Sequence, residues 1–571
     1  MRSNQKVKNT RTGRSFSFLS TQLPINAVTV VSIVMLVAVP MLMLVFSAFR
    51  GPIGTLPFES NTYFTTENIY EAFQFGNFNR MARDTIMYVT GSVFLALLIG
   101  YVLAWIIERT DFPLPGIWFA AIIIPFLFPE RTIIMSWLEY ILPRTGDLNI
   151  WLRSILGSTD GRGPIDPYNL YTMVIFQGLM LTPIVFLVLA ATLRNQNGAM
   201  EEASRTSGAS NWVTVKSITL PLLFPGVFTA AVLSAWLTID STNVPMTLGG
   251  ASKVSLFNFK IWAALNSVDQ SFTGFGLASS YALMGMSTLF ILFAAYTFIT
   301  RQTAKYATVT GNTMRAPKVE LGYWFLPTAS FLLLYLFLMW GLPVYRLIQG
   351  SLRAGLSGYG AQLTDDRFLS ALTNSAIMSI GSATLGTTVV VLVAWIVVRG
   401  SNGKWKTGLD LLATSSLVIP AVLAGVAFLM VFLTFKSLPL YGTLLGVTYA
   451  LAYRLAIPYR ITNAGMRQIG PDMEEVSATS GGSPFQTLKQ ITMPLLAPAI
   501  SVSWTIFFVF AMRESTLIRY LGFLDPTIGG GIRYVRGGPP GSQSAGTVIS
   551  ILFILLVILM VRYLLFRRAK F

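Results

Sequence analysis

Long apolar stretches are the feature that most constrains this chain of 571 residues. Stretches such as 28–49, 86–107 and 374–398 have the length that an α-helix needs to cross the hydrocarbon core of a bilayer. Charged residues make up only 11% of the chain, whereas a soluble domain carries about 25%. The sequence therefore predicts an all-α polytopic membrane protein whose main surroundings are a lipid bilayer.

We predict about twelve transmembrane helices from this pattern. The expected spans lie at about 28–49, 86–107, 117–140, 170–193, 222–240, 279–300, 323–349, 374–398, 409–433, 442–462, 495–512 and 546–566. The third of these spans is interrupted by Pro125, Pro129, Glu130 and Arg131, so a continuous helix is least favoured there.

The charges of the loops predict the orientation of the chain. The segment 1–25 is basic, the loops after even-numbered spans carry arginine and lysine, and residues 567–570 add more. Basic residues collect in cytoplasmic loops because they resist translocation, so we expect both termini in the cytoplasm. The same rule accounts for the net charge of +17, and we expect no nucleic acid as a partner.

The composition also limits the chemistry. The chain contains no cysteine and no histidine, which removes disulfides, thiolate metal sites, Ser-His-Asp catalysis and histidine zinc sites. The phosphate-binding pattern GxxxxGK[ST] is absent, so ATP hydrolysis by this chain is not expected. We expect no catalytic residue, no metal site and no cofactor bound by this chain.

Two internal matches indicate that the chain repeats itself. The segment 91–109 recurs at 381–399 with an offset of 290, which aligns Arg109 with Arg399. The segment 201–221 (EEASRTSGASNWVTVKSITLP) recurs at 474–494 (EEVSATSGGSPFQTLKQITMP) with an offset of 273. The first half therefore has 17 more residues between these landmarks, which we assign to the polar insertion at 141–169.

Six predicted spans separate the two copies of the second motif, so both copies face the same side of the membrane. The halves are then parallel repeats of six helices each, related by a pseudo-twofold axis along the membrane normal. We divide the chain into a tail (1–25), a first half (26–305), a linker (306–322) and a second half (323–571). The segments 200–221 and 473–494 are named the first and second polar loops.

The polar loops have two interpretations. A short helix ending at glycine, followed by a second segment ending in proline, would present a rigid knob to another protein. Alternatively, they are solvated amphipathic loops that recur only through gene duplication. The two copies keep identical internal spacing and are more alike than most of the spans, which favours the knob.

The polar loops resemble the EAA loop of ABC importer permeases. The matching residues are Glu201, Glu202, Ala203, Ser204, Gly208, Ile218 and Pro221 in the first loop, and Glu474, Glu475, Val476, Ser477, Gly481, Ile491 and Pro494 in the second. Val476 departs from the alanine that is usual in the family.

The resemblance implies a type I ABC importer permease fold in a bacterial inner membrane. It implies that each loop is a coupling helix seated on one of two cytoplasmic ABC ATPase subunits, which bind ATP and Mg²⁺. It also implies that an extracytoplasmic substrate-binding protein docks on the outer face.

The sequence is similar, more narrowly, to the ferric iron permease group. Val244-Pro245, the segment 308–311 and Arg513-Glu514 look like patterns of that group, which implies ferric iron as the substrate. Permeases for thiamine, 2-aminoethylphosphonate, polyamines or other small solutes share the architecture and stay as alternatives.

Two acidic triplets recur on the spans that follow the polar loops. They are Asp240-Ser241-Thr242 and Glu514-Ser515-Thr516, at an offset of 274. A charge at the bilayer centre costs about 2.5 kcal/mol or more, so these acids are expected to face a cavity, a partner or the interface. Either they line the translocation path or its gate, where carboxylates favour a cation, or they cap their spans, with Arg513 or Arg519 neutralising Glu514.

Two other classes of protein share some of these features. A secondary transporter driven by an ion gradient also has repeats and twelve spans, but it has no need of twin polar loops. A membrane enzyme is disfavoured because the chain lacks histidine, cysteine and clustered carboxylates.

Overall fold

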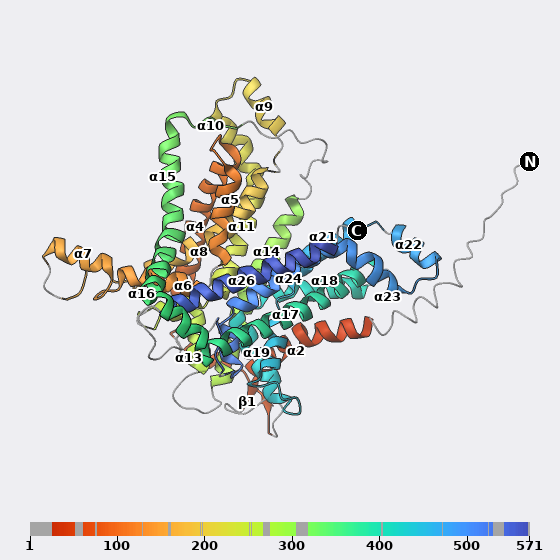
Figure 1. Ribbon diagram of the computed structural model, residues 1–571. Helices are drawn as coiled ribbons and strands as arrows, with labels where there is room; N and C mark the ends of the chain where they lie inside the picture. The colour runs from red at the N-terminus through yellow and green to blue at the C-terminus, as the bar shows by residue number, and fades with distance from the viewer. Residues whose placement is uncertain are drawn as a thin grey trace, which may run out of the picture.

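The computed structural model describes residues 26–51, 61–74, 77–127, 130–157, 161–194, 196, 198–250, 252, 254–265, 274–303, 318–400, 404–470, 472–523, 525–528 and 542–568. The predicted basic tail (1–25), most of the predicted linker (306–322) and the segment 308–311 lie outside the described residues. The described chain is almost entirely helical, as the apolar stretches predict (Figure 1).

The helices of the first half follow one another with short connections. In chain order the elements are η1 (Val34–Ala38), α2 (Val39–Ala48), β1 (Arg50–Gly51), β2 (Tyr63–Phe64), α3 (Glu67–Gln74), α4 (Phe78–Arg109), α5 (Pro115–Ile123), η2 (Ile124–Leu127), α6 (Glu130–Ile141), α7 (Asp147–Leu156), α8 (Leu170–Arg194), α9 (Gly198–Thr206), α10 (Asn211–Thr214), η3 (Val215–Thr219), α11 (Leu220–Asp240), α12 (Asn243–Leu248), α13 (Phe257–Leu265) and α14 (Gly274–Thr303). The strands β1 and β2 pair antiparallel.

The second half repeats much of this order. Its elements are η5 (Gly322–Trp324), α15 (Phe325–Leu336), η6 (Phe337–Gly341), α16 (Leu342–Thr364), α17 (Asp366–Arg399), α18 (Lys404–Ser415), η7 (Ser416–Val418), α19 (Ala421–Thr434), α20 (Leu444–Leu451), α21 (Ala456–Gln468), α22 (Asp472–Thr479), α23 (Pro484–Thr487), η8 (Leu488–Thr492), α24 (Met493–Arg513), α25 (Thr516–Tyr520) and α26 (Ser542–Arg568). Both halves thus place a short helical loop directly before a long apolar helix, α11 or α24.

Nine of the twelve predicted spans are continuous helices that are long and apolar enough to cross a membrane, within the residues that the structure describes. The bent pair 115–126 and 130–141 raises this number to ten. The predicted count of twelve is therefore not confirmed. The spans predicted at 117–140, 409–433 and 442–462 are each broken into shorter helices.

The breaks have a local cause and recur in both halves. In the first half, α5 and α6 meet at 91°, with Pro125 in the intervening turn η2. In the second half, α18 and α19 are separated by η7 and by Pro420, which is the N-cap of α19. Proline removes a backbone donor and disfavours helical geometry in the preceding residue, so both spans break at equivalent places.

The two hydrophobic cores do not follow the division of the sequence into halves. One core joins α4, α6 and α8 of the first half to Leu332, Tyr335 and Met339 of α15 and η6. The other joins α17, α19 and α24 of the second half to residues of α2 and α14. Each half therefore contributes helices to the hydrophobic core of the other half. The indole N–H of Trp137 in the first half donates a hydrogen bond to the Leu338 carbonyl of the second half at 2.8 Å.

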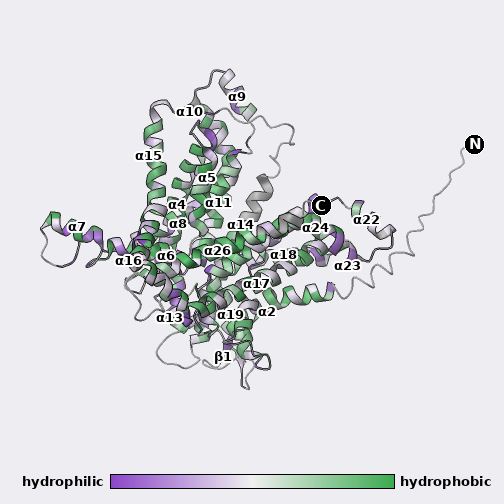
Figure 2. Ribbon diagram, viewed as in Figure 1, coloured by the Kyte–Doolittle hydropathy of each residue, from purple (hydrophilic) through white to green (hydrophobic). Residues whose placement is uncertain are grey.

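The polar loops lie at separate ends of the molecule. In Figure 1, α4, α8 and α11 run toward α9 and α10 at the top, and α17, α24 and α26 run toward α22 and α23 at the right. Figure 2 shows hydrophobic residues along the long helices and hydrophilic residues gathered at α9, α10 and α23. The two bundles diverge toward the polar loops, and the far ends of α11 and α24 meet each other through Thr242 and Thr516.

The close packing of α4 on α8 depends on a glycine. A Cβ atom at Gly100 would lie 2.6 Å from Val185 Cγ1 and 3.1 Å from the backbone nitrogen of Phe186. We expect Gly100→Leu to lower the free energy of unfolding by about 1–3 kcal/mol, because the side chain overpacks the helix interface. Gly408→Leu is the control, since a Cβ there meets open space. The measurement is thermal stability in detergent, followed by size-exclusion chromatography. A Gly100→Leu variant as stable as Gly408→Leu and the wild type would contradict this packing.

Candidate functional site: the polar loops and the charged junction

Each polar loop consists of two short helices joined at a glycine. In the first loop Gly208 connects α9 to α10 with a φ of 85°, and in the second Gly481 connects α22 to α23 with a φ of 86°. A Cβ atom at either position would meet nothing within 4 Å. The glycines are therefore required by the left-handed backbone and not by lack of space.

A pair of hydroxyl groups closes each loop. Ser204 Oγ lies 2.9 Å from Thr214 Oγ1 in the first loop, and Ser477 Oγ lies 2.8 Å from Thr487 Oγ1 in the second. Each pair joins the helix before the glycine to the helix after it. The same contact in both copies indicates that the two loops share one internal shape.

The first glutamate of each loop is directed inward. Glu201 accepts hydrogen bonds from Arg109 at 3.2 Å and from the Thr219 hydroxyl at 2.9 Å, and its ion pair with Arg109 has a closest approach of 3.1 Å. The side chains of Arg109 and Glu201 are 4% and 10% exposed. This carboxylate therefore fixes the loop to the end of α4 and does not form part of its outer surface.

The second loop repeats this anchor. Glu474 pairs with Arg399 at 2.8 Å and accepts a hydrogen bond from Thr492 at 2.9 Å. Arg109 and Arg399 are aligned by the sequence repeat, but sequence reasoning assigned them no partner. The signal that could have found the pairing is that the repeat is expected to place both motifs on one side of the membrane, with the arginine at the end of a predicted span and the glutamate in the polar loop.

Each loop exposes apolar side chains among its polar residues. Trp212 and Phe485, which occupy equivalent positions, are 72% and 57% exposed. Met200 and Met473 are also equivalent and exposed, and Val476 adds a further apolar side chain to the second loop.

The remaining residues of the predicted loop motif divide into exposed and half-buried positions. Those exposed are Glu202, Ala203, Pro221, Glu475 and Pro494, and those half-buried are Ile218 and Ile491. The prolines stand in the first turn of α11 and α24, where a missing backbone donor is tolerated. Each loop thus presents exposed apolar side chains on a frame held by an ion pair, which is buried in the first loop and half-buried in the second.

The predicted acidic triplets lie at the other ends of the same helices. Asp240 is the last residue of α11, and Glu514 directly follows α24. Each of these helices has 21 residues, which corresponds to about 30 Å between polar loop and triplet. The structure brings the two triplets together, and Thr242 hydrogen-bonds directly to Thr516.

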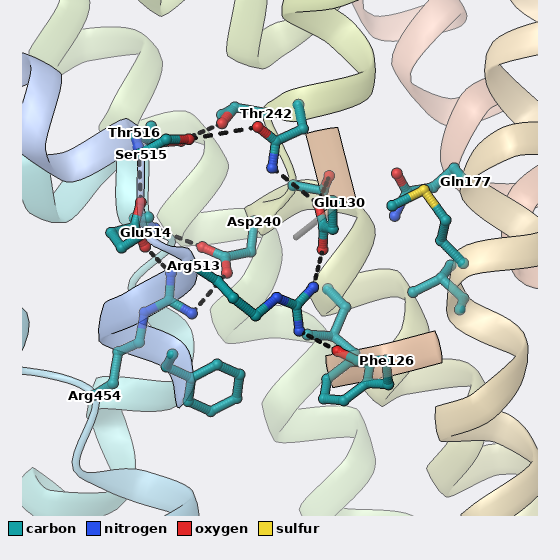
Figure 3. Close-up of a pocket in the computed structure, with 17 residues that line it drawn as sticks. Phe126, Glu130, Gln177, Asp240, Thr242, Arg454, Arg513, Glu514, Ser515 and Thr516 are labelled. Atoms are coloured by element: carbon teal, nitrogen blue, oxygen red, sulfur yellow. Dashed lines mark hydrogen bonds and ion pairs between the residues drawn. The ribbon is translucent and has the colours of Figure 1, made fainter. Parts of the chain in front are cut away.

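Arg454 joins the two acids. Its guanidinium lies 3.2 Å from Asp240 Oδ2 and 2.8 Å from Glu514 Oε2, as Figure 3 shows. Asp240 also accepts from the backbone N–H of Ala421 at 2.5 Å, and Glu514 accepts from the N–H groups of Thr516 and Leu517. The neutralising partner of Glu514 is thus Arg454, not Arg513 or Arg519 as the capping interpretation proposed.

Arg513 makes the second charged contact of this junction. It donates to the Phe126 carbonyl at 2.5 Å and to Glu130 at 3.5 Å. Glu130 also accepts from Ser241 at 3.2 Å and from Asn243 at 3.0 Å. We name this set the charged junction: Glu130, Asp240, Arg454, Arg513 and Glu514.

The charged junction surrounds a small cavity of about 80 Å³. All three residues of each predicted triplet line it, together with Arg454, Arg513 and Glu130 (Figure 3). Sequence reasoning missed Glu130 and Arg454 as members of this site. Both interrupt predicted apolar spans, 117–140 and 442–462, and a charge within such a span is the signal that could have identified them.

The fold and the two polar loops define a polytopic membrane protein with a duplicated helical unit. The chain matches the family described as "Binding-protein-dependent transport system inner membrane component" over residues 112–305 and 386–570. It belongs to this family, and the two matched regions agree with the internal repeat.

Individual relatives carry related names. The chain is 27% identical over 379 residues to a putative ferric transport system permease protein, FbpB 1, of Haemophilus influenzae, covering 63% of this chain and 58% of the relative. It is 26% identical over 425 residues to the ferric transport system permease protein FbpB of Actinobacillus pleuropneumoniae, covering 71% and 59%. A putrescine transport system permease protein, PotI, of Escherichia coli is 29% identical over 176 residues, covering 28% and 59%. The chain spans about three fifths of the length of these relatives.

The anchor of the first polar loop leads to a stability prediction. We expect Arg109→Ala to release the loop, because it leaves the buried Glu201 carboxylate without its cation at a cost of about 3–5 kcal/mol. Limited trypsin digestion is then expected to cut at Lys216 faster than in the wild type. Glu202→Ala is the control, since this neighbouring side chain is exposed. Equal cleavage rates in both variants would contradict the anchoring role.

Proposed function

We propose that this chain is the transmembrane permease subunit of an ATP-driven importer and that its polar loops couple it to two cytoplasmic ATPase subunits. The observation that carries the proposal is the duplication of one rigid device. Each loop has the same glycine turn, the same hydroxyl pair and the same arginine–glutamate anchor, which is buried in the first loop and half-buried in the second. Two copies fit two identical partners, one under each half.

The exposed apolar residues of the loops support docking to protein. Trp212 and Phe485 stand on equivalent positions, and aromatic side chains of this kind are typical anchors of protein interfaces. In this proposal both loops and both termini are cytoplasmic, in agreement with the basic residues of the loops. ATP and Mg²⁺ are bound by the ATPase subunits, and this chain supplies no cofactor of its own.

The helices α11 and α24 carry movement from the loops to the charged junction. When ATP draws the ATPase subunits together, the loops approach each other, and the rigid helices transmit this displacement over about 30 Å. The far ends then separate, and the path opens to the outer face, where a substrate-binding protein delivers its cargo. Hydrolysis returns the bundles to the arrangement of Figure 1, so the permease is a two-state element biased from both faces.

We propose ferric iron as the substrate, with Asp240-Ser241-Thr242 and Glu514-Ser515-Thr516 lining the path. The names of the relatives FbpB 1 and FbpB support iron. The three carboxylates that line the cavity of the junction outnumber its two arginines, which favours a cation. The relative PotI supports an organic cation, such as a polyamine, as the second candidate. Binding of ⁵⁵Fe³⁺ and of putrescine to the purified cognate substrate-binding protein distinguishes these two.

The glycine turns provide the test of coupling. We expect the double variant Gly208→Val, Gly481→Val to lose ATP-driven uptake by about tenfold or more, because a β-branched residue strains the left-handed turn and displaces the apolar knob. The measurement is uptake and ATPase rate in proteoliposomes that contain the ATPase subunits and the binding protein.

Gly408→Val is the matched control, since that glycine has open space around it and lies within a helix. Uptake that persists in the double variant, or uptake by the permease alone in an ion gradient, would overturn the proposal and favour a secondary transporter.

A further inference from the structure

The charged junction connects the two halves of the chain asymmetrically. Its two cations, Arg454 and Arg513, both belong to the second half, and the groups they reach across the boundary belong to the first. Arg454 crosses to Asp240, and Arg513 crosses to Glu130 and to the Phe126 carbonyl. At the offset of 274, which aligns the two acidic triplets, Arg513 corresponds to Ile239 and Arg454 to Met180, which are both apolar. The repeat therefore duplicates the acids Asp240 and Glu514 of the junction but not its two cations.

The contacts of Arg454 are well shielded from water, whereas Glu130, the partner of Arg513, is 28% exposed. The side chains of Arg454, Asp240 and Glu514 are 15%, 10% and 7% exposed, and that of Arg513 is 11% exposed. Charges in such surroundings are screened much less than on a surface, so a broken pair leaves a costly unpaired charge. The pairs therefore favour the arrangement in which the far ends of α11 and α24 touch.

Neutral contacts reinforce the same boundary. Thr242 of the first half hydrogen-bonds to Thr516 of the second, and Ser515 Oγ lies 3.4 Å from Asn243 Oδ1. The N-terminus of α19 adds the Ala421 N–H, which donates to Asp240. The first two contacts are lost if the far ends of α11 and α24 move apart, and the Ala421 contact is lost if α19 moves together with α24.

We propose that Arg454 and Arg513 are gating residues that hold the path closed through ion pairs to Asp240 and Glu130, and that these pairs break in every transport cycle. The inference rests on the proposed importer function, because it assigns the step at which the path opens. It adds Glu130, Arg454 and Arg513 to the site, and it explains why the resting conformation stays closed without ATP. Separation leaves Glu130 and Asp240 on the first half without their cations, so opening requires work from the ATPase subunits.

A pair of cysteines tests whether the boundary separates. The natural chain has no cysteine, so Thr242→Cys with Thr516→Cys introduces the only two thiols. The two hydroxyl groups touch, which places the side chains within reach of a disulfide. We expect oxidation to reduce ATP-driven uptake by about tenfold or more and reduction to restore it, because a locked junction cannot undergo the two-state change.

The control pair lies within one half. Thr462 Oγ1 and Ser503 Oγ are 2.9 Å apart, on α21 and α24 of the second half. A disulfide between Thr462→Cys and Ser503→Cys crosses no boundary between halves and is expected to leave uptake unchanged. A cross-linked Thr242–Thr516 variant that transports at the rate of its reduced form would overturn the proposal.

Substitutions that remove or keep the charge of Arg454 test its role in holding the path closed. We expect Arg454→Gln to raise the ATPase rate without binding protein by about tenfold, since losing a shielded ion pair shifts the closed–open equilibrium by at least that factor. Arg454→Lys is expected to retain most of the closure. Arg460→Gln is the control, because this arginine follows six residues later in the sequence, pairs with Asp410 outside the junction and has a side chain that is 56% exposed.

These outcomes are separable from those of the proposed function. If the wild-type chain fails to stimulate its ATPase subunits, the importer proposal itself fails. If the wild type is stimulated by binding protein but Arg454→Gln and the Thr242–Thr516 disulfide both behave as wild type, only the gating assignment is wrong. The cysteine pair leaves every charge of the junction in place, so it stays informative where a charge variant folds poorly.

Discussion

The pairing of charges inside an apolar bundle is the constraint on which the rest of this structure depends. A carboxylate that is shielded from water and has no cation beside it destabilises the folded state, so the acids of the described sites pair with arginines. Arg109 and Arg399 fix the two polar loops, and Arg454 joins the two acids at the junction. Both ends of α11 and α24 are thereby positioned by ion pairs, and the helices between them are rigid connections.

The two ends of these helices differ in a way that suits their roles. The anchors of the loops lie within one half each and recur in both copies, so they hold a shape that two equal partners can use. The charged junction lies between the halves, and its cations come from one side only. The two anchored polar loops at one end allow two equal partners to bind. The single charged junction at the other end lets both partners act on one shared path.

Much of this was predictable from particular residues. The apolar stretches predicted the all-α membrane fold, and nine spans were found as continuous helices in the described part of the chain. The resemblance of 201–221 and 474–494 to one family was confirmed by the family match. The broken helices were predicted only in part. The interruption at Pro125 was noted in the predicted span 117–140. The break before Pro420, which disfavours helical geometry in the residue before it, was not predicted.

The sequence by itself determined the periodic features: the apolar spans, the duplication and the residues that each polar loop repeats. These follow from local composition and spacing, which a chain carries before it folds. Only the tertiary structure decided that helices are exchanged between the two cores and that Arg454 pairs with Asp240 and Glu514. Those contacts join segments separated by 60 residues or more, and charge pairing between such segments depends on which helices pack together, which no local pattern records.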